Sequence, residues 1–293
     1  MKKISSAIFL LAFIVFIGCK NNAEQASEED KKDSASIFYQ SIVKLGNGFI
    51  DVFNAFGGLV ADTFFKTDPK KSDVKTYFDS ITKTLKDTKD NLEKLSNEKT
   101  SGDGDKKAAA AAVGGAEIAE AVKKVNGWLE KMLKAAEEIA KAVAGNDGTK
   151  IGESVNNGVG ADAGSVKGIA TGMKGIVDAA TESGVKFETA DVVDVDNKNA
   201  GKLFGTAAGG DAAAADVAKA AAAVGVVSGE QILKAIADAA GDTTNHDGKK
   251  GADAENAIQA AIGGGHRGEA FADDKLGKKN DQIAAALVLR GMA

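Results

Sequence analysis

Few residues of this sequence have types and spacing suited to catalysis. The chain has two histidines, His246 and His266, and neither lies at metal-ligand spacing from a second histidine or a cysteine. The glycines at 263, 265 and 268 match a dinucleotide-binding fingerprint in letters, but they follow a predicted helix, whereas that fingerprint follows a strand. We therefore interpret both features as parts of loops and expect no cofactor.

A calcium loop is the nearest approach to a metal site. Thr243, Asn245, Asp247 and Gly248 occupy ligand and turn positions of such a loop, yet its twelfth position is Ala254, so the bidentate acid is missing. The sequence also lacks the phosphate-binding, nucleophile-elbow and zinc-protease motifs. It predicts neither an enzyme nor a bound metal.

Cys19 is the residue whose surroundings predict a chemical modification. Lys2 and Lys3 precede an apolar segment at 8–17 that is too short to span a membrane, and Gly18 is a small residue directly before the cysteine. This order is typical of a lipoprotein signal peptide, which signal peptidase II cleaves between Gly18 and Cys19, leaving the thiol to carry a diacylglycerol. An ordinary secretory signal is the alternative; we favour it less because Cys19 is the only cysteine and lies at the cleavage point.

Charge and composition restrict the classes of function. The chain carries 37 basic and 42 acidic residues, and loss of residues 1–18 would change its formal charge from -5 to -7, because that segment holds two lysines and no acid. A mildly acidic chain has no net attraction for nucleic acid or for anionic lipid. With a single cysteine no internal disulfide can form, so the fold must depend on its core.

The distribution of apolar side chains predicts three segments. Residues 1–18 form the signal peptide, and residues 19–36 form a flexible tether, because 20–34 hold no large apolar side chain. Residues 37–293 form a single helical domain, since alanine is abundant, β-branched runs are scarce and Pro69 is the only proline.

The strongest helical patterns lie early in this domain. Between Ile37 and Phe64 large apolar side chains recur every three or four residues, which predicts a long helix with an aromatic face. Asp68 and Pro69 mark a turn, and Ser72 is a candidate cap for a second helix. The second helix has a 3.5-residue repeat, which favours antiparallel packing on the first as a helical hairpin. Its members are Val74, Phe78, Ile81, Leu85, Thr88, Leu92 and Leu95.

Further helices separated by polar, glycine-rich loops are predicted for the rest of the chain. Trp128 should anchor the core of one helix, and Ser228 with Gln231 forms a capping box before another. Residues 187–199 are interpreted as a loop, because no partner strand is visible. The apolar positions are Ile118, Val122, Val125, Leu129, Met132, Leu133, Ala136, Ile139 and Val143; Val166, Ile169, Met173, Ile176, Val177 and Ala180; Leu203, Phe204, Val217 and Val224; Ile232, Leu233 and Ile236; Ile258 and Ile262; and Ile283, Leu287 and Val288. The predicted fold class is all-α, a multi-helix bundle with a long N-terminal helical hairpin.

Four segments of the chain resemble one known family. They are residues 38–53, 68–78, 227–233 and 278–293. These segments resemble the Vmp-like (Vls) surface lipoproteins of Lyme disease spirochaetes, which belong with the variable large proteins of relapsing fever spirochaetes. The resemblance covers essentially the whole chain.

The resemblance implies a non-catalytic antigen on the cell outer membrane, anchored by lipid at Cys19. Such an antigen changes its central region by recombination from silent cassettes and so escapes host antibodies. Its variable loops would lie near 97–107, 145–164, 187–199, 242–251 and 263–274, where surface changes cost little stability. Residues 165–180, 200–205, 228–233 and 278–293 look like the family's invariable segments.

The last of these invariable segments resembles the family's immunodominant one, which implies an antibody partner there. The candidate epitope residues are Lys278, Lys279, Asp281, Gln282 and Arg290. Ile283, Leu287 and Val288 should form a buried face, leaving the lysine-rich edge in solvent. Family members continue beyond this segment with a further helix, so we expect the C-terminus of this sequence to be incomplete.

An adhesin for host glycosaminoglycan or extracellular matrix is the alternative function. Lysine pairs at 70–71, 106–107, 123–124, 249–250 and 278–279 could cluster into a basic patch. We favour the interpretation that these lysines are solvated and balanced by neighbouring acids. Salt-dependent retention on heparin would favour the adhesin.

Overall fold

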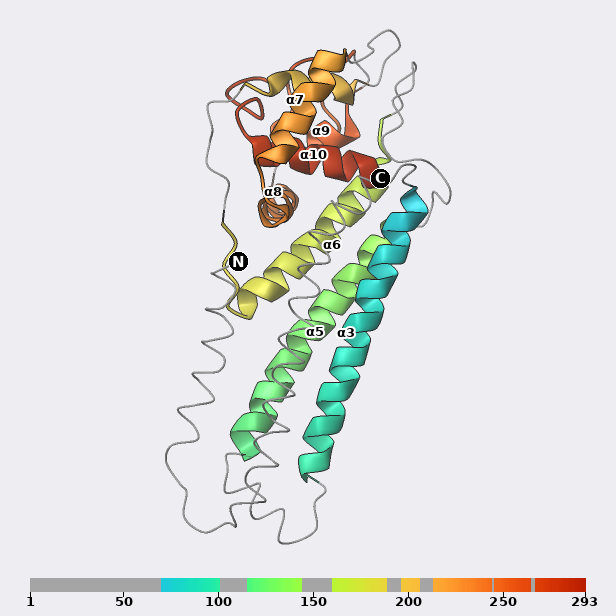
Figure 1. The fold of residues 1–293 in the computed structure, drawn as a ribbon, viewed down its shortest axis with the longest axis vertical. Helices are drawn as coiled ribbons and strands as arrows, with labels where there is room; N and C mark the ends of the chain where they lie inside the picture. Colours follow the sequence, from blue (N-terminus) through green and yellow to red (C-terminus); the bar gives the residue numbers. More distant parts are fainter. Residues whose placement is uncertain are drawn as a thin grey trace. The chain divides into compact units, whose positions relative to one another are not determined.

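The regular elements of the described residues are all helical (Figure 1). The computed structural model describes residues 70–100, 115–143, 160–188, 196–205, 213–243, 245–264 and 267–293, with the backbone alone at 91, 94–100 and 115–121. The helices are α3 (Lys71–Thr100), α5 (Gly115–Val143), α6 (Ala163–Glu182), the 3-10 helix η3 (Lys198–Phe204), α7 (Ala214–Gly225), α8 (Gly229–Gly241), α9 (Ala257–Ile262) and α10 (Asn280–Met292). The predicted all-α class is confirmed. The signal peptide, the tether and the aromatic face at 37–64 lie outside the described residues and stay predictions.

The described residues fall into two compact units. Lys83–Leu133 and Ala179–Val185 belong to one unit, and the other described residues belong to the second. In the first unit Lys131 on α5 pairs with Glu182 on α6 at 2.5 Å. The predicted bounds of the signal, tether and helical segments are not tested by this division.

Helix α3 begins at Lys71, two residues earlier than a cap at Ser72 requires. The Lys70 N–H donates to the Asp73 carboxylate at 3.0 Å, and the Asp73 N–H donates to the Lys70 carbonyl at 2.9 Å. Ser72 therefore lies inside the first turn, and the prediction that it caps the helix is wrong. The helix also continues to Thr100, so residues 97–100 are helical where a loop was predicted.

The heptad repeat of α3 is confirmed as a buried stripe. Its large apolar members, where the side chains are described, are all buried: Val74, Phe78, Ile81, Leu85 and Leu92. Thr88 is partly buried, and its hydroxyl donates to the Thr84 carbonyl at 2.8 Å. A hydroxyl that bonds its own helix can occupy a core position without leaving a polar group unpaired.

The core of α5 is centred on residues other than the predicted one. Trp128 is partly exposed, whereas Leu129 and Met132 are buried. The prediction that Trp128 anchors this core is therefore wrong. The buried stripe of the helix passes through Leu129, the residue that follows the indole.

Glycines bring α6 close to the C-terminal part of α5. A Cβ added at Gly175 would lie 3.0 Å from the Ala135 Cβ, and one added at Gly172 would overlap the Ile139 side chain and lie 2.8 Å from the Ala135 carbonyl oxygen. A larger residue at Gly172 would push the helices apart. The predicted face of α6, which comprises Val166, Ile169, Met173, Ile176, Val177 and Ala180, is buried.

Helix α8 starts as the sequence predicts. The Ser228 N–H donates to the Gln231 side-chain oxygen at 2.9 Å, and the Gln231 N–H donates to the Ser228 hydroxyl oxygen at 3.2 Å. Both halves of the capping box are present, so two N–H groups of the first turn are satisfied. Ile232, Leu233 and Ile236 are buried.

Helix α7 packs through small side chains. Val217 is 49% exposed and Val224 is partly exposed, so the prediction that they are the packing residues is wrong. The buried residues are instead Asp216, Ala220 and Ala223.

A carboxylate fixes the start of α7. Asp216 is 4% exposed, accepts the Ala213 N–H at 3.1 Å and pairs with Lys202 on η3 at 3.2 Å. The pair joins the start of α7 to η3. A carboxylate in the first turn is also favoured by the helix dipole.

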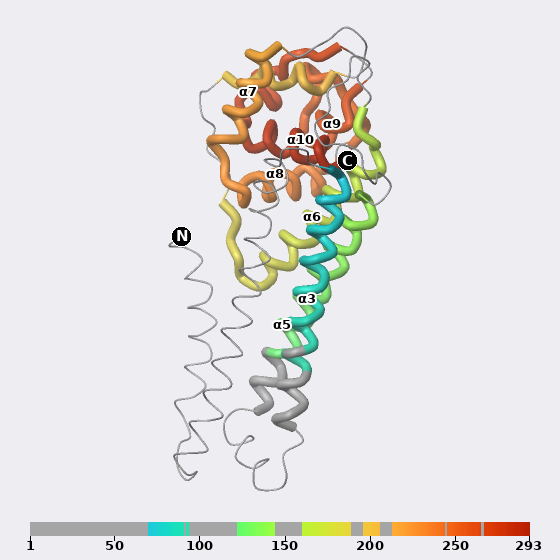
Figure 2. Tube along the Cα trace, turned by 45° about the vertical axis from the view of Figure 1, so that its right-hand side comes forward, coloured from blue at the N-terminus to red at the C-terminus, as the bar shows by residue number. Residues whose placement is uncertain are grey.

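Helix α10 lies among the other C-terminal helices. It packs against α7, α8 and α9, and Figures 1 and 2 show it between them. The short helix α9 is capped by Asn256, whose side-chain oxygen accepts the Gln259 N–H at 3.0 Å. The helix is followed by Gly263, whose φ of 76° is a backbone conformation that favours glycine. The core of this part of the molecule is thus built around the last described helix of the chain.

Candidate functional site: the C-terminal helix and its loops

The predicted epitope segment is mostly a buried helix. Nine of the thirteen residues of α10 are buried: Asn280, Ile283, Ala284, Ala285, Ala286, Val288, Leu289, Gly291 and Met292. Lys278 and Lys279, which precede the helix, are exposed, and Leu287 is partly exposed. The lysine-rich edge therefore reaches solvent as expected, but burial extends around the helix and not over one face alone.

Asp281 and Gln282 occupy the first turn of α10 and are partly buried. Burial raises the pKa of the Asp281 carboxyl, although backbone N–H groups at Asp281 and Gln282 and the charge of Lys279 act in the opposite direction. The Gln282 side-chain oxygen accepts the Ala257 N–H at 3.3 Å, which links α10 to the start of α9. Asp281 and Gln282 are therefore both engaged in the packing at the start of α10.

Arg290 is partly buried and its guanidinium contacts two other elements of the fold. Its guanidinium lies 5.8 Å from the centre of the Phe204 ring and donates to the Ala261 carbonyl at 2.9 Å. Burial lowers the pKa of this guanidinium. A cation near the last carbonyl groups of α9 satisfies acceptors that the helix cannot satisfy itself.

Two contacts join η3 to the C-terminal segment. The Phe204 and Phe271 rings lie 5.4 Å apart between centroids, and both are buried. Asn197 and Asn280 are fully buried or nearly so, and the Asn197 amide nitrogen donates to the Asn280 side-chain oxygen at 2.9 Å. Sequence reasoning missed the asparagine pair, because polar side chains 83 residues apart carry no periodic signal.

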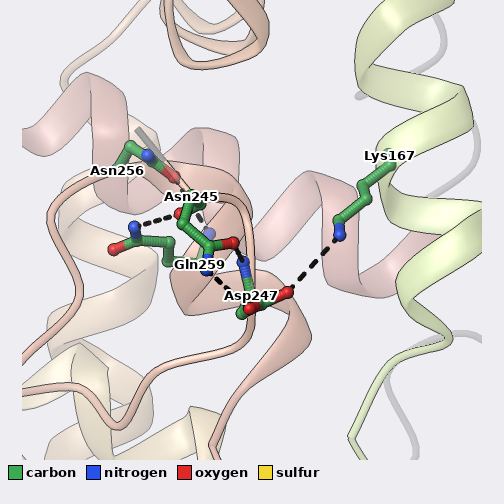
Figure 3. A network of polar contacts seen from close by, with 5 residues as sticks. All are labelled: Lys167, Asn245, Asp247, Asn256 and Gln259. Atoms are coloured by element: carbon green, nitrogen blue, oxygen red, sulfur yellow. Dashed lines mark hydrogen bonds and ion pairs between the residues drawn. The ribbon is translucent and has the colours of Figure 1, made fainter. Parts of the chain in front are cut away.

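The loop that approaches a calcium motif is held by its own polar groups (Figure 3). The Asn245 amide nitrogen donates to the Asp247 carboxylate at 2.6 Å, and the Asp247 N–H donates back to the Asn245 side-chain oxygen at 2.9 Å. The Asp247 carboxylate also lies 3.8 Å from the Lys167 amine on α6. The buried Gln259 donates to the Asn245 carbonyl at 2.6 Å. The Asp247 carboxylate of this loop therefore lies beside the lysine amine of Lys167.

His246 belongs to no candidate metal cluster among the described residues. No group of three His, Cys, Asp or Glu side chains in that part of the chain could hold a metal ion. His246 lies in a loop, as predicted, and its side chain is partly buried. His266 lies outside the described residues.

Several of the paired lysines are already engaged. Lys71 donates to the carbonyl of Ala293, and burial lowers the pKa of its amine. Lys250 lies 3.2 Å from Glu269 and 3.9 Å from Asp253. Lys123, Lys124, Lys278 and Lys279 are exposed, and the pair at 106–107 lies outside the described residues.

Among the described helices, none alone is long and apolar enough to cross a membrane. Helices α7 and α8 together have the length and apolar composition of a span, but they are bent by 100° at the break between them.

The chain belongs to the Borrelia lipoprotein family, whose model matches residues 49–293. Within that family it is similar to variable large protein 17 of Borrelia hermsii, with 32% identity over 100% of this chain and 78% of the relative. It is 36% identical to variable large protein 12 of the same organism over 75% of this chain, and the match spans 62% of that relative, less than two thirds of its length.

A solved structure agrees with this assignment. The crystal structure of the Lyme disease variable surface antigen VlsE of Borrelia burgdorferi is similar to this chain, with a TM-score of 0.64 and 46% identity over 87% of this chain and 80% of that one. The resemblance drawn from sequence segments is confirmed. The chain is therefore a member of a group of helical, variable surface lipoproteins.

Proposed function

We propose that this protein is an outer-membrane surface antigen that changes its exposed loops by recombination and so evades host antibodies. The observation that carries the proposal is the contrast between α10, with nine of thirteen residues buried, and the charged loops beside it. Helices that supply the core must keep their sequence, whereas exposed side chains can change at little cost in stability. This division suits an antigen that varies while its fold persists.

The protein acts without catalysis in this proposal. The solved structure that this chain resembles is that of a surface antigen by its title, and the described residues hold no cluster suited to a metal. Its partners are the membrane, through lipid on Cys19, and host antibodies.

The decisive experiment follows the gene through an immune host. One clonal culture is sequenced at this gene before and after passage through an immunocompetent animal and, as a control, through an animal without antibodies. We expect codon changes concentrated in the loops near 145–164, 187–199, 242–251 and 263–274 after the first passage alone. An unchanged gene, or equal change in both hosts, would contradict the proposal.

Membrane anchoring has a separate test. Three acyl chains, as usual for such lipoproteins, should anchor stably, since each buried CH2 contributes about 0.8 kcal/mol. Cys19→Ser should release the protein from membranes and abolish palmitate incorporation. A variant that still partitions into detergent and still incorporates palmitate would overturn the anchor.

The adhesin is less well supported by the charges of the described residues. A sulfated glycan needs cations without nearby acids, whereas Lys250 lies beside Glu269 and Asp253. Absence of heparin retention at low salt would leave the antigen as the sole proposal.

A further inference from the structure

The segment that follows α6 is irregular and largely exposed (Figure 1). Helix α6 has ended before residues 185–188, which form neither helix nor turn. The Val185 N–H donates to the Ala180 carbonyl at 3.0 Å, and the Gly184 N–H donates to the Thr181 carbonyl at 2.9 Å. These two bonds and the φ of 97° at Gly184 make a Schellman motif, which closes the end of the helix. The chain beyond Val185 is therefore not needed to hold α6.

The two residues after this motif differ in what they offer a partner. Lys186 is exposed, and none of the ion pairs of the described residues includes it. Phe187 is partly buried and is engaged in an interaction within the fold. The next fixed point is Glu188, whose N–H donates to the Glu230 carboxylate on α8 at 3.2 Å. The bond between Lys186 and Phe187 thus lies in a short irregular stretch with an accessible cation directly before it.

Such a stretch has the properties of a protease substrate. Proteases bind the chain that they cut in an extended form, so a bond within a helix has to unwind before it is cleaved. Trypsin-like serine proteases also hold a basic side chain in a specificity pocket that contains a carboxylate. A lysine that is paired with an acid must first give up that ion pair. Lys186 meets both requirements as it stands in the fold.

Several other basic residues outside the α-helices are held by their contacts. The bond after Arg267 leads into Gly268, where an added Cβ would overlap the Lys202 carbonyl oxygen, so another backbone lies against this bond. The bond after Lys279 leads into Asn280, which is 2% exposed. Three further lysines are paired with acids: Lys198, Lys202 and Lys250.

We propose that the bond between Lys186 and Phe187 is a cleavage site for a trypsin-like serine protease, which cuts it in the folded protein. Water adds across the bond. Its hydroxyl goes to the Lys186 carbonyl carbon, which becomes a carboxylate, and its hydrogen goes to the Phe187 nitrogen, which becomes an amino group. This inference goes beyond the proposed function and does not depend on it.

The cut changes how the C-terminal helices are attached and leaves their packing intact. Helix α10 packs against α7, α8 and α9, and η3 packs against α7 and α9. All five elements follow the cut, and the cut interrupts no helix. Residues 187–293 therefore keep their fold but lose their covalent link to Cys19, which carries the proposed lipid anchor.

The test is limited digestion of the full chain with trypsin, followed by mass spectrometry of the earliest fragments. Initial rates of cleavage after Lys186 and after Lys123 are compared in the parent and in Lys186→Gln, Lys186→Arg and Lys123→Gln. Lys123 is the matched control site, because it is also exposed but lies within α5. Circular dichroism of the variants and of the nicked protein measures their helical content.

We expect cleavage after Lys186 to be at least about tenfold faster than after Lys123, because α5 has to open locally before it is cut. Lys186→Arg should retain the cut, Lys186→Gln should abolish it, and Lys123→Gln should leave it unchanged. Urea below the unfolding transition should accelerate cleavage within helices but not after Lys186, with rates normalised to a peptide substrate.

Two outcomes would show that the bond is cut only after unfolding. They are equal rates after Lys186 and Lys123, and a rate after Lys186 that rises with urea in parallel with the helical sites. Loss of helical content in the nicked protein would contradict the persistence of the fold after the cut.

Chymotrypsin tests whether the lysine selects the protease. It cleaves after aromatic residues, and Phe187 is partly buried, so cleavage after Phe187 should be slower than tryptic cleavage after Lys186. Equal rates for the two enzymes would overturn the selection by lysine. None of these outcomes affects the passage experiment, so failure of the cleavage site would leave the proposed function as it stands.

Discussion

Helices α7 and α10 are both rich in alanine, but few residues of α7 are buried and most residues of α10 are buried. In α7 three of twelve residues are buried, and Ala214, Ala215 and Ala218 are exposed. In α10 nine of thirteen residues are buried, among them Ala284, Ala285 and Ala286. Alanine is compatible with either environment because it is small and favours helix, so what surrounds the helix decides whether it is core or surface.

The largest expected effect comes from placing the same charge on both helices. Ala285→Lys should destabilise the fold by more than about 3 kcal/mol or prevent folding, because it would bury an unpaired ammonium group. Ala218→Lys on α7 should change the free energy of unfolding by less than about 0.5 kcal/mol. Denaturant unfolding measures the free energy of unfolding of both variants. Similar losses in the two would contradict the difference in burial between α7 and α10.

Burial of α10 should also hide it from antibodies. An antibody raised against a free peptide of residues 278–293 should bind the folded protein at least tenfold more weakly than the heat-denatured protein, because opening a segment that costs about 1.4 kcal/mol reduces affinity by that factor. Binding is compared on protein attached through Cys19. Equal affinity for the two forms would show that Lys278, Lys279 and their neighbours suffice for recognition in the folded state.

Two helical glycines differ in whether another residue lies against them: Gly172 is in contact with a neighbouring helix, and Gly127 is not. Gly172→Ala on α6 should cost about 1–3 kcal/mol, because the added methyl overlaps Ile139. Gly127→Ala on α5 is the control: a Cβ there meets nothing within 4 Å, so the variant should be stabilised by about 0.5–1 kcal/mol. Thermal unfolding of both should give shifts of opposite sign, and shifts of the same sign would contradict the close contact.

Capping should have a smaller effect. Ser228→Ala removes one half of the box that begins α8 and should cost about 1 kcal/mol. Helix α7 has only the carboxylate half, since its cap residue is Ala213, so Ala213→Ser should stabilise the protein by up to about 1 kcal/mol. A loss of stability in Ala213→Ser would show that the start of α7 cannot accept a hydroxyl.

The smallest expected effect concerns Asp281. Because burial raises the pKa of this acid, the folded chain holds its proton more readily than the unfolded chain, and the ionised carboxylate opposes folding at neutral pH. Asp281→Asn should therefore stabilise the protein at pH 7, by less than about 1 kcal/mol. The gain should shrink as the pH falls through the folded-state pKa. A loss at pH 7 would mean that contacts with the helix N-terminus outweigh burial.

Periodicity of large side chains predicted the parts of the fold that depend on it. The stripe of α3, the face of α6 and the capping box of α8 follow from spacing and local hydrogen bonds, and all three are confirmed. The assignments of Val217 and Trp128 to the core were wrong, because size and apolarity alone do not say which side of a helix its neighbours cover.

The candidate site was only partly predictable, for a different physical reason. Exposure of Lys278 and Lys279 follows from their charge. The contact of Arg290 with Phe204 and the packing of loop glycines against other backbones depend on residues far apart in the chain. Glycine in a loop predicts a turn equally well whether or not another backbone lies against it.

The buried hydrogen bond between Asn197 and Asn280 should make the contact of η3 with α10 insensitive to pH and salt. Neither amide carries a charge, so their hydrogen bond does not titrate and is not screened by dissolved ions, unlike the lysine–carboxylate pairs on the surface. Changes of acidity or ionic strength between one host fluid and another should loosen the outer ion pairs first. The attachment of η3 to the start of α10 should persist through such changes.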